Sequence, residues 1–331
     1  MLEFSIIHAD DRRSRLERWL AAELRGAHFA LTPASEDASF RRYFRATLDD
    51  GASFVIMDAP PEKEDCRPFV HVARLLHEAG VHAPEVHAAD LAAGFLLLSD
   101  LGTRTYLAEL NAGNADALMR DATDALLRWQ LATRPGELPP YDEALLRREL
   151  NLFPEWYVGR HRGLTLSSAQ ALALEGIFAT LVKSALAQPA VYVHRDYMPR
   201  NLMVSEPNPG VLDFQDAVLG PISYDMVCLV RDAFISWDEE RELDWSVRYW
   251  EKARAARLPV PVQFAEFWRA LEWMGLQRHL KVLGIFARIN YRDGKPRYLE
   301  DTPRFLRYAR AVAARYGELA PLARLLDEIE A

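Results

Sequence analysis

Residues 191–204 read VYVHRDYMPRNLMV, and residues 210–217 read GVLDFQDA. Each polar run lies between apolar, strand-like segments, which places Asp196, Asn201 and Asp213 at strand ends or on the loops between strands. Side chains at such positions are rigidly held and yet open to a cleft. The two stretches therefore predict a strand-containing island that carries a functional site.

The residue types in this island suit phosphoryl transfer to a hydroxyl group. That reaction needs a carboxylate that accepts the hydroxyl proton, and oxygen ligands for Mg²⁺ on the nucleotide phosphates. Asp196 fits the catalytic base, and Asn201 and Asp213 fit the metal ligands because both offer hard oxygen donors. A lone aspartate is more often a turn or cap residue. The combination His-x-Asp-x4-Asn, followed by Asp-Phe twelve residues after the Asn, favours the catalytic interpretation.

Two further polar residues near the island are expected to have structural roles. His194 is expected to pack in the loop and to hydrogen-bond to backbone, in preference to transferring a proton. Asp225, in the stretch GPISYD, can cap the helix that follows it or reach back to brace the catalytic loop.

Around the island, hydrophobic periodicity predicts a small sheet-rich part followed by a large helical part. Asp10 or Asp11 is expected to cap a first helix. SFRRYFRATL (39–48) and ASFVIMDA (52–59) predict a hairpin, because strand-like runs flank an Asp-Asp-Gly turn. The other elements expected in this part are a helix over residues 68–79 and strands within residues 81–90 and 94–100.

Beyond Asp100 the pattern is helical, apart from the island between Val191 and Phe214. This order predicts an α+β fold of two lobes, a small antiparallel sheet lobe followed by a large, mainly helical lobe. We divide the chain into residues 1–100, expected to bind ATP, and residues 101–331, expected to carry catalysis and acceptor binding. A cleft between two such lobes is a common place for a ligand.

The composition predicts a globular protein whose partner is a small molecule. Of 331 residues half are hydrophobic, and the formal charge of -8 argues against nucleic-acid binding, which needs a basic surface. Cys66 and Cys228 show no spacing typical of a disulfide framework or a zinc site. No stretch reaches the roughly 18 uninterrupted apolar residues of a membrane span, and the N-terminus lacks a signal-peptide pattern. We therefore expect no membrane contact and a cytoplasmic location, and a monomer is the working expectation.

The stretches HRDYMPRNLMV, VLDFQDA and GPISYDMV together resemble the aminoglycoside phosphotransferase superfamily. The resemblance implies a bilobal, protein-kinase-like fold, a small-molecule acceptor, ATP as co-substrate and Mg²⁺. The stretches SFRRYFR, VIMDAPPEKEDCRPFV, ELNLFPEWYVGRH, LVRDAFISW and LQRHLKVLGIFARINYRDGKPRYL are similar to the anomeric N-acetylmuramate/N-acetylglucosamine kinases of bacterial cell-wall recycling. This closer resemblance implies transfer of the ATP γ-phosphate to the anomeric hydroxyl of an amino sugar.

One position departs from the superfamily. Its members usually place a lysine on the third strand to hold the nucleotide phosphates, and the matching position here is Met57. A methionine in a strand packs in a core and cannot neutralise phosphate charge. The phosphate contacts are therefore expected from backbone N–H groups of the loop Ser35 to Ser39 and from cations nearby. The candidate cations are Arg42, Arg45 or Lys63, and the alternative is that the arginines of SFRRYFR only solvate a strand face.

The stretch LLLSDLG, residues 96–102, matches the connector between the lobes of such enzymes. The resemblance implies that the adenine base hydrogen-bonds to connector backbone, at Ser99, Asp100 and Leu101. A strand that simply leaves the sheet is the plainer interpretation, and the two are compatible.

Three cations are candidates for acceptor binding. Arg278 and Lys281 lie on one expected helix, off its apolar stripe, and Arg231 follows the Asp225 region. N-acetylmuramate carries a lactyl carboxylate, and arginine can bind a carboxylate through two N–H groups. We therefore expect Arg231 or the Arg278/Lys281 pair to contact the acceptor, with a solvated helix face as the alternative. The stripe expected to be buried is Leu276, Leu280, Leu283 and Ala287.

Two other functions stay open at this point. Fold and catalytic loop do not fix the acceptor, so a kinase of another small alcohol, such as an aminoglycoside, choline or homoserine, is one alternative. A non-catalytic kinase-like binding module is the other, suggested by Met57. Such proteins typically lose the base or a metal ligand, whereas Asp196, Asn201 and Asp213 are all present.

Overall fold

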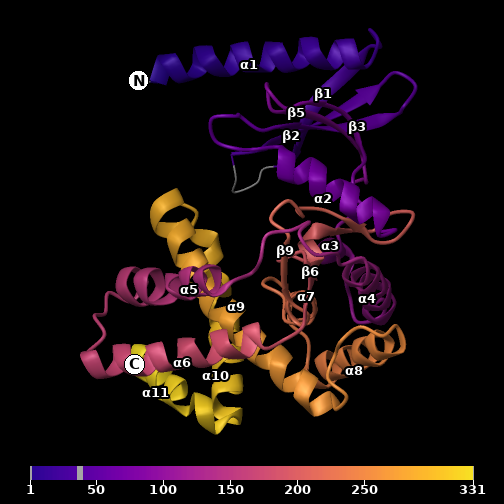
Figure 1. The fold of residues 1–331 in the computed structure, drawn as a ribbon. Coiled ribbons are helices and arrows are strands. Elements are labelled where there is room, and N and C mark those ends of the chain that lie inside the picture. The colour runs from indigo at the N-terminus through magenta and orange to yellow at the C-terminus, as the bar shows by residue number, and fades with distance from the viewer. Residues whose placement is uncertain (1, 36–39, 331) are drawn as a thin grey trace. The chain divides into compact units, whose positions relative to one another are not determined.

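The computed structural model describes residues 2–35 and 40–330, which form two compact units (Figure 1). The first unit comprises Met1–Arg104 with Met203–Asp216, and the second comprises Thr105–Leu202 with Ala217–Ala331. A single division near residue 100 does not capture this arrangement, because a later segment packs with the N-terminal residues. Within the first unit, Val204 N donates to Arg104 O at 2.8 Å and Val211 N donates to His82 O at 2.8 Å. The binding roles expected of the two parts stay predictions.

The first unit is built on a five-stranded antiparallel sheet with the strand order β1-β2-β3-β5-β4. The predicted hairpin is confirmed, since Arg42 pairs with Asp58 and Thr47 with Ser53 across its two strands. The strands predicted near residues 81–90 and 94–100 are confirmed as well. The strands are β1 (Phe29–Ser35), β2 (Arg42–Leu48), β3 (Ser53–Asp58), β4 (Val86–Asp90) and β5 (Phe95–Ser99).

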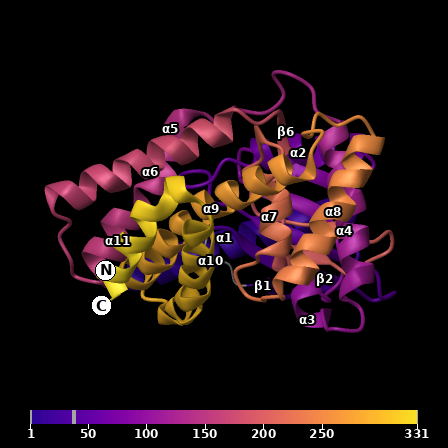
Figure 2. The same ribbon diagram turned by 90° about the horizontal axis from the view of Figure 1, so that it is seen from below.

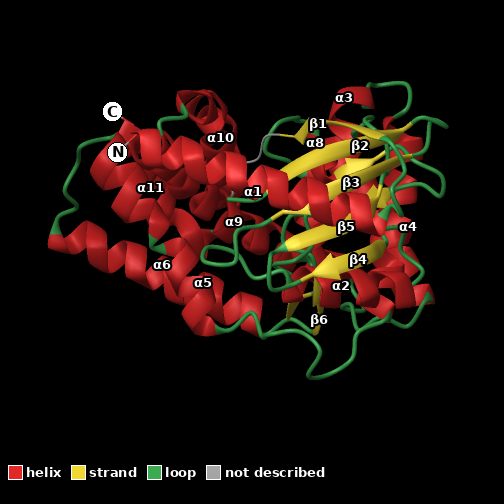
Figure 3. Cartoon of the chain, turned by 90° about the horizontal axis from the view of Figure 1, so that it is seen from above, coloured by secondary structure: helices red, strands yellow, loops and turns green. Residues whose placement is uncertain are grey.

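Helix α1 (Leu2–Glu23) covers one face of this sheet (Figure 3). Leu16 and Leu20 are fully buried in a cluster with strand side chains of that face, among them Ile56. The expected helix start at Asp10 or Asp11 was wrong, because the helix begins at Leu2. Residues 2–9 contain no proline or glycine that would end a helix.

Helix α2 (Arg67–Glu78) lies on the opposite face of the sheet from α1 (Figure 1). It confirms the helix expected over residues 68–79. Its first turn contains Pro68, and the helix tolerates a proline there because the N–H that proline lacks would have no helical partner. Phe69 and Leu76 belong to its strongly amphipathic buried face.

The second unit is mainly helical, as predicted, with short strands near the catalytic loop. Strands β6 (Ala190–Val193) and β9 (Val218–Pro221) pair antiparallel, and the 3-10 turn η2 (Pro199–Asn201) follows β6. Strand β7 (Leu202–Met203) pairs with β8 (Gly210–Val211), and Met203 and β8 belong to the segment that is grouped with the first unit. The helices are α3 (Tyr106–Glu109), α4 (Ala115–Leu131), α5 (Glu143–Leu150), the π-helix η1 (Phe153–His161), α6 (Ser168–Leu186), α7 (Tyr224–Val230), α8 (Glu239–Ala255), α9 (Phe264–Asp293), η3 (Pro296–Asp301), α10 (Thr302–Arg315), η4 (Gly317–Leu319) and α11 (Ala320–Glu330).

Helix α9 is the central element of this unit, and it packs against η1, α10 and α6 (Figure 2). The predicted stripe is confirmed, because Leu276, Leu280, Leu283 and Ala287 are all fully buried. A Cβ at Gly284 would lie 2.3 Å from the carbonyl carbon of Leu152. The absence of a side chain at this position therefore allows α9 to approach the chain just before η1.

Helix α6 has the length and apolar composition of a membrane-spanning helix. One stripe of it, including Leu174, Phe178 and Leu181, is buried within the second unit. Its opposite side carries polar residues, among them Glu175 and Lys183. We therefore assign α6 to the core of a globular unit.

Candidate active site

The loop of residues 194–201, which the sequence predicts to be catalytic, follows strand β6 and is braced by Asp225. The two carboxylate oxygens of Asp225 accept the backbone N–H groups of His194 at 2.7 Å and Arg195 at 3.0 Å. Burial raises the pKa of Asp225 to about 7, although the two backbone hydrogen bonds act in the opposite direction. Of the two roles considered for Asp225, the structure therefore shows the brace of the loop.

His194 is buried and takes part in the loop itself. Its Nδ1 atom accepts the backbone N–H of Asp196 at 3.2 Å, and its ring meets the edge of Tyr197. The expected packing role, with a hydrogen bond to backbone, is confirmed. The phenol of Tyr197 donates to Ala122 O at 2.7 Å and ties the loop to α4.

Asp196 and Asn201 are brought together by this loop. The amide nitrogen of Asn201 donates to the main-chain oxygen of Asp196 at 2.9 Å, and Asn201 N donates to Met198 O at 2.8 Å. These bonds fix the orientation of the Asn201 amide, whose carbonyl oxygen is the atom able to coordinate a cation. The loop thus supplies one carboxylate and one oriented amide.

Asp213, the third predicted residue, lies in the first unit. Its φ angle is +61°, a left-handed conformation that aspartate tolerates better than most residues. Gln215 Nε2 donates to Asp213 Oδ1 at 2.9 Å. The neighbouring Phe214 packs against Phe69 of α2, with ring centroids 4.6 Å apart. The carboxylate is therefore held on a short, anchored turn of the first unit.

Glu149 on α5 is a functional candidate that sequence reasoning missed. Its Oε1 atom lies 2.5 Å from Arg195 Nη2 and 2.9 Å from Lys281 Nζ. Its Oε2 atom accepts hydrogen bonds from Tyr141 and Gln277. Burial would raise the pKa of Glu149, but the charges of Lys281 and Arg195 hold it at about 2. Glu149 is therefore an ionised hub that anchors the residue directly before Asp196.

Residues 30–260 of the chain match the phosphotransferase enzyme family. The chain belongs to this family. It is 60% identical over 302 residues to an N-acetylmuramate/N-acetylglucosamine kinase of Pseudomonas putida, covering 91% of this chain and 89% of the relative. It is 52% identical over 322 residues to a kinase of the same name from Neisseria meningitidis, covering 96% of each chain.

Solved structures of low sequence identity share the fold. A choline/ethanolamine kinase family protein of Mesorhizobium loti aligns with a TM-score of 0.63 at 16% identity, covering 96% of this chain and 98% of that one. An ADP-bound aminoglycoside phosphotransferase aligns with a TM-score of 0.59 at 16% identity, covering 89% of this chain and 97% of that one. These structures confirm the predicted α+β fold, and the family match together with the relatives of 52–60% identity confirms the predicted family.

Met57, which we expect at the position of the family's usual strand lysine, is fully buried in the sheet. Among the cations expected to replace that lysine, Arg42 Nε donates to Asp58 Oδ2 at 3.0 Å. Lys63 lies over the ring of Phe40, 4.2 Å from its centroid. Both side chains belong to the first unit, and their contact with phosphates stays a prediction.

Arg45 and the loop after β1 complete the set of expected phosphate contacts. Arg45 binds Asp100 through two hydrogen bonds, of 2.6 and 3.0 Å, and donates to Gly102 O at 2.9 Å. Its guanidinium therefore fixes the connector. Ser35 is the last residue of β1, and Ser39 lies outside the described residues.

The connector residues Ser99, Asp100 and Leu101 line a pocket of about 360 Å³ in the first unit. Ser99 Oγ accepts the backbone N–H of Glu85 at 2.8 Å, so this side chain is engaged in holding the connector to β4. The other lining residues are His77, His82, Ala83, Glu85, Ser205 and Glu206.

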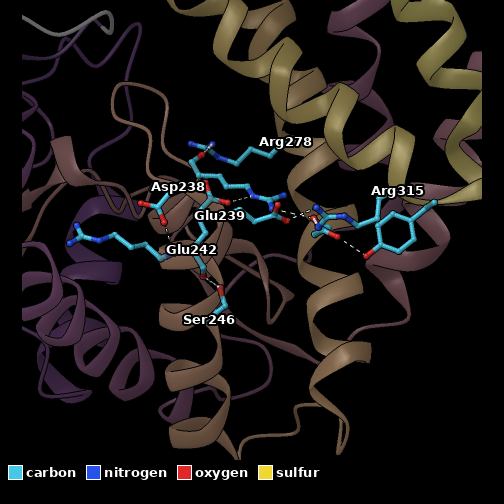
Figure 4. A network of polar contacts seen from close by, with 10 residues as sticks. Asp238, Glu239, Glu242, Ser246, Arg278 and Arg315 are labelled. Atoms are coloured by element: carbon cyan, nitrogen blue, oxygen red, sulfur yellow. Dashed lines mark hydrogen bonds and ion pairs between the residues drawn. The ribbon is translucent and has the colours of Figure 1, made fainter. Parts of the chain in front are cut away.

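The three cations expected to bind the acceptor are all internal to the second unit. Arg231 is 4% exposed and pairs with Glu242 at 2.9 Å and Glu272 at 3.2 Å. Glu272 also pairs with Arg315 at 2.6 Å, which extends the network across α8, α9 and α10 (Figure 4). Tyr316 donates to the second oxygen of Glu272 at 2.6 Å.

Arg278 and Lys281 are likewise buried. Arg278 Nη1 donates to Arg231 O at 3.2 Å, and Nη2 lies 3.8 Å from the sulfur of Met198 in the catalytic loop. Lys281 pairs with Glu149 and donates to the hydroxyl of Tyr224 at 3.1 Å. These contacts tie α9 to the catalytic loop and do not present the three cations to solvent.

Proposed function

We propose that the protein transfers the γ-phosphate of ATP to the anomeric hydroxyl of N-acetylmuramate or N-acetylglucosamine, in the recycling of bacterial peptidoglycan. The proposal rests on relatives of that name at 60% identity over 91% of the chain. The structural observation that carries the chemistry is the braced loop that holds Asp196 beside Asn201. Since ATP is consumed, we place the reaction in the cytoplasm.

Asp196 is the proposed catalytic base. Its carboxylate accepts the proton of the sugar hydroxyl as the oxygen attacks the γ-phosphorus, and ADP leaves. Asp225 and Glu149 hold the two residues before Asp196, so the backbone that carries the carboxylate is in place before the reaction. A base held in this way favours an enzyme that acts on a hydroxyl group over a non-catalytic binding module.

Asn201 and Asp213 are the proposed ligands of Mg²⁺. An amide oxygen and a carboxylate fit this cation, which takes one or two protein oxygens and completes its shell with phosphate oxygens and water. The hydrogen bond from Asn201 Nδ2 to Asp196 O uses the amide's donor end for structure. When bound, Mg²⁺ would neutralise the charge of the nucleotide phosphates. The backbone of Ser99, Asp100 and Leu101 is proposed to hold adenine, and Arg42 and Lys63 to contribute phosphate contacts.

The test is a coupled ADP-release assay with N-acetylmuramate, N-acetylglucosamine, glucose and an aminoglycoside, followed by ³¹P NMR of the products. We expect turnover of the two N-acetylated sugars and a phosphorus signal coupled to the anomeric proton. Turnover of the aminoglycoside alone, or a signal coupled only to protons at other carbons, would overturn this proposal.

A further inference from the structure

The acceptor carboxylate needs a cation that is accessible and has no carboxylate partner. Arg231 and Lys281 already pair with buried glutamates, and displacing such a partner would leave an uncompensated buried charge. Arg278 is 2% exposed and donates to Arg231 O. The carboxylate site must therefore use other cations of the second unit.

Arg200 is the first such cation, and it belongs to the catalytic loop. It lies in η2 directly before Asn201, four residues after Asp196. It is half-buried, and its guanidinium carbon lies over Phe234, 5.1 Å from the ring centroid. Its Cα can lie at most about 14 Å from that of Asp196, because four residues of extended chain span no more.

Arg297 of η3 is the second cation of this kind. It is exposed, and its guanidinium carbon lies 5.3 Å from the ring centroid of Tyr298. The positive charges of Arg297 and Arg200 both act on the phenol of Tyr298. Burial would raise the pKa of Tyr298, but hydrogen bonding by Arg297 and Arg200 lowers it instead. Among the side chains that the structure describes, no carboxylate pairs with either arginine.

Aromatic rings give this pair of arginines a rigid backing. The ring of Phe286 lies 5.3 Å from Tyr298 and 6.4 Å from Phe234, so the three rings form a continuous wall under the guanidinium groups. Two like charges held near one another without an anion repel, and an added carboxylate relieves that repulsion. Guanidinium groups with prearranged stems lose little side-chain entropy when they bind one.

We propose that Arg200 and Arg297, arranged around Tyr298, bind the lactyl carboxylate of N-acetylmuramate. The inference rests on the proposed function and names the charged part of the substrate that this site recognises. The carboxylate and the reacting hydroxyl belong to one sugar ring, so their binding groups must be close together. An arginine within the catalytic loop satisfies that requirement. N-acetylglucosamine, which has no carboxylate, would leave both arginines unused.

The experiment compares Arg200→Gln and Arg297→Gln with the wild-type protein on both sugars. The measured quantity is kcat/KM for N-acetylmuramate divided by kcat/KM for N-acetylglucosamine, which cancels any general effect on folding or on ATP binding. We expect this ratio to fall by about 10- to 100-fold in each variant, the range of a lost charge-assisted hydrogen bond. Arg297→Lys, which retains the charge, should lower the ratio less.

Arg292→Gln is the matched control, because Arg292 is an exposed arginine of the same region that binds Asp293. Its ratio should equal that of the wild type. If both sugars are turned over and the ratio in either test variant stays within twofold of that of the wild type, the paired carboxylate site is wrong. The proposed function is unaffected by that result. A wild-type protein that phosphorylates neither sugar overturns the proposed function, and this site with it.

Discussion

Arg195 holds a left-handed backbone conformation, with φ of +76°, that few residues other than glycine adopt. Such a conformation costs on the order of 1–3 kcal/mol and persists only where the surroundings impose it. Here Asp225 accepts its N–H, Glu149 binds its guanidinium, and the thiol of Cys228 donates to its carbonyl oxygen. These three contacts hold Arg195 in place directly before Asp196.

Asp196→Asn should remove most of the turnover while nucleotide binding stays close to that of the wild type. The amide retains the shape of the carboxylate and cannot accept the proton of the hydroxyl. Loss of a general base commonly lowers the rate by about 10²–10⁴-fold. Steady-state kinetics combined with a nucleotide titration measures both effects. A variant that keeps more than half of the wild-type rate would contradict the role of Asp196 as base.

At the level of single elements, local signals predicted the structure where partners are near in sequence. The β2–β3 hairpin and α2 were predicted because a turn and a helical periodicity fall within a short stretch. Strand β9 was not predicted, because its four residues gain strand structure only by pairing with β6. The start of α1 was also missed, since an aspartate inside a helix resembles a cap in sequence.

The close approach between α9 and Leu152 should make Gly284→Ala destabilising. The added methyl group would lie 2.3 Å from the carbonyl carbon and 2.4 Å from the carbonyl oxygen of Leu152, so backbone must move. Overpacking of this kind costs about 1–3 kcal/mol. The control is Gly176→Ala in α6, where nothing lies within 4 Å and alanine is the better helix former.

Chemical denaturation of the two variants measures the difference directly. Gly176→Ala should raise the free energy of unfolding by about 0.5–1 kcal/mol, because glycine weakens a helix interior. Equal effects of the two substitutions would show that helix propensity alone determines the change in the free energy of unfolding. The contact between α9 and Leu152 would then not restrict α9.

For the molecule as a whole, the sequence predicted the chemistry better than the placement of charge. The His-x-Asp-x4-Asn pattern identified a loop that hydrogen bonds from Asn201 and to Asp225 hold in place. Charged residues in helices are usually solvated, so nothing in the sequence was a reason to assign a role to Glu149. Arg231 was expected to contact a substrate, because arginine can bind a carboxylate. Their partners are remote in sequence, as Lys281 is from Glu149, and only the folded chain brings them together. The grouping of residues 203–216 with the first unit depends on equally remote contacts.

Glu149 should make the free energy of unfolding depend on pH below about pH 4.5. Its pKa is held at about 2 in the folded protein, below its ordinary value of 4.5. The unfolded chain therefore binds the proton more readily, and the stabilisation by this carboxylate is fully present above about pH 4.5. It is lost as the pH falls toward about 2. A shift of this size corresponds to about 3 kcal/mol.

Glu149→Gln isolates this contribution, because the amide does not titrate and leaves Arg195 and Lys281 without their shared anion. At pH 7 the variant should lose about 3–5 kcal/mol of unfolding free energy, as for a broken buried ion pair. The gap to the wild type should shrink by up to about 1.4 kcal/mol per pH unit below pH 4.5, because only the wild type binds the additional proton on unfolding. Glu143→Gln removes an exposed glutamate of the same helix that pairs with Arg147, and it should cost less than about 1 kcal/mol at every pH. Urea denaturation at intervals between pH 7 and pH 3 gives all three curves. A gap that stays constant over this range would mean that Glu149 is not an ionised hub, and that Arg195 is positioned by its backbone contacts alone.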